Sequence, residues 1–491
     1  MYTGRGFNRS ELGDVDILRH DGMYHLFHLV LPNHDYIAHA VSVDGLLWRR
    51  VRNALFIGEP GDWDDDMLWT MHVSKDPDGP ASWRMFYTGI SRREGGRVQR
   101  IGLARSPDLY HWEKAGGLHY PLSIEGPHYE SSTDEGRHWV SCRDPFFFID
   151  GQDRYLLVDA RVPSGPVARR GCVGIAREVS PDSFIWEHPL FVPRMYDDIE
   201  VPVLSKIGDE YYLIGNIRED IKVHYWHSPN LRGPFEAHAD NVLLPKGNYA
   251  VRLIPEEDRL LLWNFYISGS DNSGGRILPP PAELKRKKDG TLYISSYSGF
   301  DDKVQATLEH ESLFPLQPVL GNPTAEIEET DWSREIRSVS GYEVCFLKPE
   351  AADFRLRGEV CLEGLGKFGL VIRSNEEASG YYISLDVLNG FVQTRFWGTR
   401  DQAELEEAFE FTDLQESHFQ VSPERTHGMQ ALAWGGYLEF SIDGIIVLRL
   451  VDTRFMKGTR LGFYVESAVL KVSDLSLDIL DGPEEEDHGI I

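Results

Sequence analysis

The chain has 491 residues and a mass of 56.0 kDa, which is too long for one ordinary core, so we expect two or three domains or one large repeat body with an accessory domain. Its 78 Asp and Glu outnumber its 50 Lys and Arg, and the resulting charge of −28 disfavours nucleic acid and anionic membranes as partners. None of the four cysteines forms a CxxC pair, which argues against a zinc site. Without a visible signal peptide or an apolar span, we expect a cytoplasmic protein whose oligomeric state stays open.

Short strand-like runs separated by turn signals dominate the first 300 residues, and helical periodicity is nearly absent. Such runs of β-branched and aromatic residues, bounded by the turn dipeptides Asp-Gly and Pro-Asp, are typical of an all-β protein. The clearest runs are MYHLFHLV (23–30), RMFYTGI (84–90), RYLLVDA (154–160), YYLIGNI (211–217) and RLLLWNFY (259–266).

The runs belong to a repeat that ends each time in a short strand, a Ser-x-Asp or Ser-Pro-Asp turn and an aromatic residue. Five units of about 45–75 residues, each long enough for about four strands, predict a five-bladed β-propeller over residues 1–300. A stack of unrelated β-sandwiches is the alternative, but it does not explain the recurring spacing. The turn copies are AVSVDGLLW (40–48), ARSPDLYHW (104–112), AREVSPDSFIW (176–186) and HSPNLRGPF (227–235).

The sequence pattern changes after residue 300, where the repeat ends. Residues 301–340 are acidic and lack the repeat, so we interpret them as a linker. Alternating strands in residues 341–482 predict a C-terminal β-sandwich, and residues 483–491 read as a disordered acidic tail. Two hairpin signals stand inside the predicted sandwich, at Asn389-Gly390 and Asp443-Gly444.

Acidic residues head the first strand of three predicted blades: Asp14 and Asp16 in blade 1, Asp144 in blade 3 and Glu200 in blade 4. Acids are depleted in strands and costly to bury unpaired, and the first strands of a propeller all line its central funnel. A cluster of carboxylates suits glycoside cleavage, in which one attacks and another donates a proton. The alternative is that each acid caps a turn or pairs with a neighbouring arginine, as Arg143 next to Asp144 invites.

The order of these motifs resembles glycoside hydrolase family 32, the five-bladed fructan and sucrose hydrolases with a trailing sandwich. The resemblance covers about residues 10–300. The family's opening Trp-Met-Asn-Asp-Pro-Asn-Gly is replaced by LGDVD at 12–16, and the spacing of ten from Asp14 to Tyr24 also suits the related family 43. The segments that carry the resemblance are YHLF (24–27), AHAVSVDGLLWRR (38–50), FYTG (86–89), CRDPFFF (142–148), IEVPVL (199–204) and RILPPPAELKRKKDGTLY (276–293).

The resemblance implies roles for the acidic residues. Asp14 would be the nucleophile, with Asp16 as second choice, and Glu200 would be the acid/base. Asp144 would bind ring hydroxyls and stabilise the transition state, oriented by Arg143, which would also contact substrate. A nucleophile implies a retaining mechanism, with Asp14 and Glu200 carboxyls about 5–5.5 Å apart, whereas about 6.5–9.5 Å would mean inversion.

Sugar rings stack on aromatic side chains, and we expect Trp69 and Tyr249 to provide such a surface in the funnel. The simpler alternative for both residues is packing between blades. Asp66 is a further candidate contact to a hydroxyl. No cofactor or metal is expected. The resemblance to family 32 therefore implies an exo-acting retaining glycosidase that hydrolyses or transfers β-fructofuranosyl residues of sucrose or short fructans. The alternatives are a family 43-like inverting arabinosidase or xylosidase, and a catalytically silent carbohydrate-binding propeller.

Overall fold

The computed structural model describes residues 2, 11–79, 82–115, 119–267, 276–330, 333–399, 409–419 and 422–483. They divide into two compact units, one reaching Leu292 and one starting at Tyr293, and each unit is described by itself. Helices in the described ranges are limited to three 3-10 turns and α1 (His310–Leu313), the turns being η1 (Arg92–Glu94), η2 (Val167–Arg169) and η3 (Ser298–Lys303). None of them has the length and hydropathy needed to cross a bilayer.

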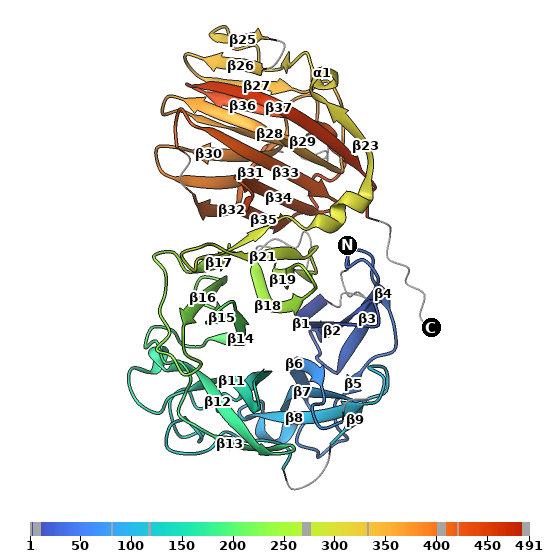
Figure 1. Cartoon of the computed structure of the whole chain (residues 1–491), viewed down its shortest axis with the longest axis vertical. Helices are drawn as coiled ribbons and strands as arrows, with labels where there is room; N and C mark the ends of the chain where they lie inside the picture. Colours follow the sequence, from blue (N-terminus) through green and yellow to red (C-terminus); the bar gives the residue numbers. More distant parts are fainter. Residues whose placement is uncertain are drawn as a thin grey trace. The chain divides into compact units, whose positions relative to one another are not determined.

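Five antiparallel sheets make up the described part of the first unit, and each runs through its strands in chain order (Figure 1). Blade 1 holds β1 (Glu11–His20), β2 (Met23–Leu31), β3 (Tyr36–Ser42), β4 (Arg49–Arg50) and β5 (Leu55–Phe56). Blade 2 holds β6 (Met67–Lys75), β7 (Trp83–Ile90), β8 (Gln99–Ser106) and β9 (Glu113–Lys114). Blade 3 holds β10 (Arg143–Asp150), β11 (Asp153–Arg161), β12 (Gly171–Ser180) and β13 (Ser183–Trp186).

Blade 4 holds β14 (Glu200–Ile207), β15 (Glu210–Ile217), β16 (Lys222–Ser228) and β17 (Val242–Leu244). Blade 5 holds β18 (Asn248–Pro255), β19 (Leu260–Ile267), β20 (Arg276–Ile277), β21 (Ala282–Arg286) and β22 (Leu292–Ser295). The first strands of successive blades contact one another, and β18 contacts β1, so the ring is closed. The predicted five-bladed propeller is confirmed, with the first strands innermost (Figure 1).

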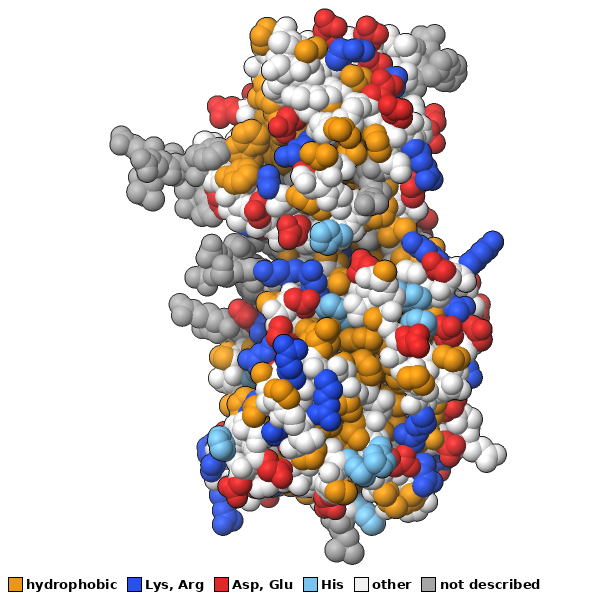
Figure 2. Space-filling model, turned by 90° about the vertical axis from the view of Figure 1, so that its left-hand side faces the viewer, with side chains coloured by type: hydrophobic (Ala, Val, Ile, Leu, Met, Phe, Trp, Pro, Cys, Tyr) orange, Lys and Arg blue, Asp and Glu red, His pale blue; other side chains and the backbone are white. Residues whose placement is uncertain are grey.

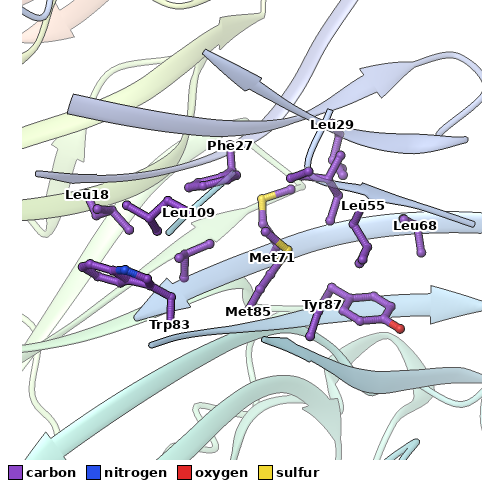
Figure 3. Close-up of a cluster of buried hydrophobic side chains, with 14 residues drawn as sticks. Leu18, Phe27, Leu29, Leu55, Leu68, Met71, Trp83, Met85, Tyr87 and Leu109 are labelled. Carbon is purple, nitrogen blue, oxygen red and sulfur yellow. The ribbon is translucent and has the colours of Figure 1, made fainter. Parts of the chain in front are cut away.

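Apolar side chains fill the space between neighbouring blades. Between blades 1 and 2, Phe27 and Leu29 of β2 pack with Met71 of β6 and with Met85 and Tyr87 of β7, all of them buried (Figure 3). A single four-stranded sheet cannot bury both of its faces, so each blade depends on its neighbours for its core.

The repeated Ser-x-Asp turn has a structural explanation. Asp44 Oδ1 accepts hydrogen bonds from the N–H groups two and three residues further on, each at 2.9 Å. Asp108 Oδ1 makes the equivalent pair at 2.8 Å, and the following Trp48 and Trp112 donate their indole N–H to backbone carbonyls. The motif therefore closes the outer turn of a blade and carries no chemistry of its own.

A β-bulge interrupts the first strand of every blade near its start. The pairing of each first strand with its second strand skips at this point, so the bulged residues leave the regular alternation of faces. The bulges fall at Gly13–Asp14 in β1, Thr70 in β6, Asp144–Pro145 in β10, Val201–Pro202 in β14 and Ala250–Val251 in β18.

The second unit contains two sheets and confirms the predicted β-sandwich. One sheet has the order β25-β26-β37-β28-β33-β34-β35 with β23 paired to β37, and the other has the order β24-β27-β36-β29-β30-β31-β32. Both hairpin signals are confirmed, because they join β30 to β31 and β34 to β35. The strands are β23 (Val304–Glu309), β24 (Gln317–Pro318), β25 (Ala325–Glu329), β26 (Ser333–Ser338), β27 (Tyr342–Phe346), β28 (Phe354–Glu363), β29 (Lys367–Ser374), β30 (Gly380–Asp386), β31 (Phe391–Thr399), β32 (Phe409–His418), β33 (Thr426–Trp434), β34 (Tyr437–Ile442), β35 (Ile445–Val451), β36 (Arg460–Glu466) and β37 (Val469–Leu480).

The predicted linker at 301–340 is wrong, because β23 to β26 and α1 lie in this range and belong to the sandwich. β23, β24 and β25 are short and keep most of their side chains exposed, so they lack the alternating apolar pattern that marks a strand in a sequence. Of the predicted acidic tail, residues 484–491 lie outside the described residues.

Candidate active site

A cavity of about 740 Å³ opens in the propeller, and all five blades contribute to its wall. Asp14, Asp144 and Glu200 line it from blades 1, 3 and 4. Trp69 of blade 2 and Tyr249 of blade 5 complete the set of predicted residues that the structure brings together. A concave site of this size suits one or two sugar rings.

Asp14 is held at the first bulge by a neighbouring blade. The hydroxyl of Thr70, the bulged residue of β6, donates a hydrogen bond to its Oδ2. Burial and the charge of Glu200 raise the pKa of Asp14 above its ordinary value, while the Thr70 hydrogen bond and the charge of Arg276 oppose that rise. The carboxyl is thus buried at the cavity wall and fixed through one oxygen.

Asp144 sits in the bulge of β10 with a left-handed backbone, φ 58°. Its Oδ2 accepts the N–H of Val201 at 3.0 Å, and its own N–H donates to the Thr88 hydroxyl at 3.1 Å. Burial raises the pKa of Asp144 to about 7, against the opposing charge of Arg143 and with the help of the two other cavity carboxylates. The residue is thus anchored from two neighbouring blades, through its backbone N–H by Thr88 of blade 2 and through its side chain by Val201 of blade 4.

Glu200 opens β14 and is hydrogen-bonded through both oxygens. Oε1 accepts from Nη2 of Arg143 at 3.0 Å, and Oε2 accepts from the hydroxyl of Tyr249. Tyr249 therefore orients the carboxyl in addition to lining the cavity. Trp69 presents an indole whose Nε1 is buried without a hydrogen-bond partner.

Arg143 is the centre of a carboxylate cluster. Its Nη2 contacts Asp159, Asp198 at 3.1 Å and Glu200 at 3.0 Å, and its Nε lies 3.6 Å from Asp144. Asp159 and Asp198 were not found in the sequence analysis. The signal available for Asp159 was an acid inside the apolar run of β11, where acids are rare.

One oxygen each of Asp159, Asp198 and Glu200 lies within 4.8 Å of the others, which is close enough for a shared metal ion. The guanidinium of Arg143, however, contacts all three carboxylates. The cluster is therefore an ion-pair network built around an internal cation.

Two predicted site residues do not reach the cavity. Asp16 is 1 % exposed, accepts from Arg252 Nε at 2.6 Å and pairs with His72 at 3.3 Å, so its charge is neutralised inside the blade contact. Asp66 does not line the cavity and pairs with Arg92 at 3.4 Å. The predictions of Asp16 as second choice of nucleophile and of Asp66 as a contact to a substrate hydroxyl are therefore wrong.

Comparisons with known proteins agree with the fold. The model described as "Glycosyl hydrolases family 32 N-terminal domain" matches residues 16–163, a span that includes Arg143 and Asp144. No curated protein sequence matches the chain.

Solved structures of sugar hydrolases share the fold over nearly the whole chain. Fructan 1-exohydrolase IIa from Cichorium intybus has a TM-score of 0.69 at 14 % identity, covering 97 % of each chain. Sucrose-6-phosphate hydrolase from Lactobacillus gasseri has a TM-score of 0.67 at 16 % identity, covering 96 % of this chain and 91 % of that one. A β-fructofuranosidase from Aspergillus kawachii has a TM-score of 0.70 at 12 % identity, covering 97 % and 93 %. Residues 16–163 thus match the N-terminal domain of glycoside hydrolase family 32, and the chain as a whole shares the fold of these sugar hydrolases.

Proposed function

We propose that the chain is an exo-acting, retaining β-fructofuranosidase that cleaves sucrose or short fructans. The observation that carries the proposal is the convergence of Asp14, Asp144 and Glu200 from three blades on one cavity. The family match supports it, as do similar structures solved with 1-kestose and with sucrose bound.

In the first step, Oδ1 of Asp14 attacks the anomeric carbon of the fructosyl unit, since Oδ2 is held by Thr70. The glycosidic C–O bond breaks, and Glu200 gives its proton to the leaving oxygen. The product is a fructosyl ester of Asp14, with Glu200 now ionised beside Arg143 and Tyr249.

In the second step, Glu200 takes a proton from water while the water oxygen attacks the same carbon. The ester bond to Asp14 breaks and fructose leaves, so both carboxyls return to their starting states. Asp144 binds two ring hydroxyls and stabilises the positive charge that develops on the ring, from a position held by the Val201 N–H.

The test is an assay of fructose release from sucrose and inulin, with a nitrophenyl arabinoside alongside. Asp14→Ala and Glu200→Ala should each lose at least about 10³-fold in kcat while keeping the wild-type thermal transition. Asp66→Ala, which removes an acid outside the cavity, should keep full activity. Reaction in methanol should give methyl β-fructofuranoside, because double displacement retains configuration.

Other outcomes would assign a different function. Release of arabinose with inversion would favour the family 43-like alternative. Sugar binding without turnover of any fructoside would favour a silent carbohydrate-binding propeller, and either result would overturn the proposal.

A phosphorylated fructoside is a second candidate substrate, because two arginines besides Arg143 line the cavity of this strongly acidic protein. Arg218 and Arg276 pair with no acidic side chain within the described ranges, and Arg276 is close enough to influence the pKa of Asp14. Arginine is the residue best suited to bind phosphate. If this substrate is used, Arg218→Gln should raise KM for sucrose 6-phosphate and leave KM for sucrose unchanged.

A further inference from the structure

Trp139 is an exposed aromatic side chain in the wall of the cavity. It lies four residues before Arg143, on the segment that leads from blade 2 into β10. The residue is 36 % exposed and lines the cavity. By contrast, Trp69, Tyr249 and Phe265, which line the same cavity, are half-buried or buried. The indole of Trp139 therefore stands at the mouth, where a ligand that extends beyond the three carboxyls would meet it.

A fixed arginine covers one face of this indole. The guanidinium carbon of Arg137 lies 4.2 Å from the centre of the Trp139 ring. Its Nη1 donates to Asp197 and Asp198 at 2.6 Å each, and its Nη2 donates to Ser141 at 2.8 Å and to Asp198 at 3.0 Å. The cation would lose these bonds if it moved off the ring, so the indole has a defined orientation and its uncovered face is available to a ligand.

The same contacts place Trp139 on the side of the cavity where Glu200 lies. Asp198, which holds Arg137, stands two residues before Glu200. Arg143, four residues after Trp139, donates to Glu200 Oε1 at 3.0 Å. In the proposed reaction Glu200 acts on the oxygen of the leaving sugar, so this sugar occupies the space beside Glu200 and toward the mouth.

An indole ring suits one face of a sugar. The C–H groups on that face are apolar and pack on a flat aromatic surface, while the hydroxyl groups stay free for water. Because the ring of Trp139 is already held by Arg137, little side-chain entropy is lost when a sugar binds. The hydrogen bonds that fix Arg137 involve no atom of the indole, so the ion-pair network does not depend on the ring.

We infer that Trp139 is the specificity-determining residue of the leaving-group subsite, where its uncovered face stacks on the sugar that is joined to the fructosyl unit. In sucrose that sugar is glucose. The subsite makes the protein select fructosides whose leaving group is itself a sugar ring over those with a small leaving group. The inference rests on the proposed cleavage of fructosides, in which Glu200 acts on the leaving oxygen.

The kinetic test compares two leaving groups in Trp139→Ala. The kcat/KM for sucrose should fall about tenfold, chiefly through KM, because stacking holds the substrate and the transition state alike. For β-fructofuranosyl fluoride, whose leaving group is one atom, kcat/KM should stay within twofold of the wild type. An equal loss on both substrates would show a structural role and overturn the inference.

Two further variants separate stacking from the covering of Arg137. Trp139→Phe keeps a flat face and should retain most of the activity on sucrose. Trp139→Leu still covers the guanidinium of Arg137 but has no flat face, so it should lose nearly as much as Trp139→Ala. Full activity of Trp139→Leu on sucrose would contradict stacking.

Phe56→Ala is the matched control. Phe56 lies on β5 of the same unit, is 56 % exposed and does not line the cavity. Its loss should leave kcat/KM unchanged on both substrates. A loss on sucrose equal to that of Trp139→Ala would show that any exposed aromatic side chain has this effect, which contradicts a specific subsite.

Calorimetric binding to the Glu200→Gln variant gives a readout that does not need turnover. Fructose fills the fructosyl site alone, whereas sucrose also fills the leaving-group subsite. Adding Trp139→Ala should weaken sucrose binding about tenfold and leave fructose binding unchanged. If both sugars or neither are weakened, the inference fails. If sucrose alone is weakened but the wild type cleaves no fructoside, the subsite stands and the proposed function fails. Binding of neither sugar before Trp139 is changed would overturn both.

Discussion

At the scale of single residues, Thr70 and Glu200 act on the pKa of Asp14 in opposite directions. Glu200 and burial raise it, and the Thr70 hydroxyl lowers it. The nucleophile has to be ionised, so the acid limb of the kcat/KM profile reports this pKa. The hydrogen bond from a side chain on the next blade therefore sets how far into the acidic range the enzyme works.

Thr70→Val should move the acid limb to higher pH by about one unit, because it removes a hydrogen bond to the charged form without changing the side-chain volume. Activity at pH 5 should fall several-fold, and activity at pH 7 should change little. A pH series of kcat/KM on sucrose measures both. An unmoved acid limb would show that Asp14 does not depend on this hydroxyl.

Because its pKa is raised in the fold, Asp144 lowers the stability of the folded state as the pH rises, whereas a carboxylate held by an ion pair raises it. Its pKa is about 7 in the fold and near 3.8 when unfolded, so the folded state binds the extra proton between these values and stability falls as the pH rises through that window. Asp144→Asn should therefore gain stability over the wild type at pH 8, by at most about 4 kcal/mol, and lose that advantage near pH 4. Thermal unfolding at the two pH values tests it, and turnover should be lost at both.

The site residues that can be predicted from the sequence are those at the start of a strand. Asp14, Asp144 and Glu200 could be found because acids there break the apolar pattern of a repeat. Regular alternation would put Asp16 on the same face as Asp14, two residues earlier, but the bulge at Gly13–Asp14 breaks that alternation. No spacing rule in one sequence reveals where a bulge falls.

At the scale of elements, blades 2 and 3 are joined by a buried cation. Arg84 on β7 is fully buried and pairs with Glu178 of β12 at 2.7 Å, with Asp182 at 3.2 Å and with Asp76 at 3.4 Å. Its guanidinium also lies over the ring of Phe147, 4.8 Å from the centroid. The contact ties two neighbouring sheets together by charge as well as by apolar packing.

Arg84→Met should destabilise the propeller by about 3–5 kcal/mol, because it leaves buried carboxylates without their shared cation. Chemical denaturation measures the loss. Arg92→Met, which removes the mostly exposed partner of Asp66, should stay within about 0.5 kcal/mol of the wild type. Equal losses in the two variants would contradict the distinction between buried and exposed pairs.

Elements with a buried face were predictable, and edge elements were not. The second strands of the blades are nearly continuous apolar runs, and each was found. The strands between 304 and 338 carry mostly exposed polar side chains, and three of them, β23, β24 and β26, pair with β37 or β27, which come later in the chain. Their side chains alone therefore do not mark them as strands.

At the scale of the whole molecule, the boundary of the second unit lies near residue 293 and not near 341. The blades are complete at Ser295, whereas a chain cut at 340 would carry β23 and β26 without β37 to pair with. Unpaired strand edges template aggregation. On the face in Figure 2, acidic and basic side chains are interspersed.

A chain ending at 297 should therefore be more soluble than the longer chain ending at 340. Light scattering of the two purified fragments at equal concentration measures the difference. Equal solubility would show that the edge strands cause no association when their partners are missing.

The recurring bulge has a consequence for how this enzyme can diversify. Val201 and Ala250 occupy in blades 4 and 5 the bulge position that Asp144 occupies in blade 3, and all three have left-handed backbones, with φ 49°, 56° and 58°. Asparagine and aspartate adopt that conformation more readily than valine or alanine. Of these two, Val201 lines the cavity, so a change to asparagine at 201 would relax the main chain and place a new polar group at the cavity wall, where fresh specificity can evolve.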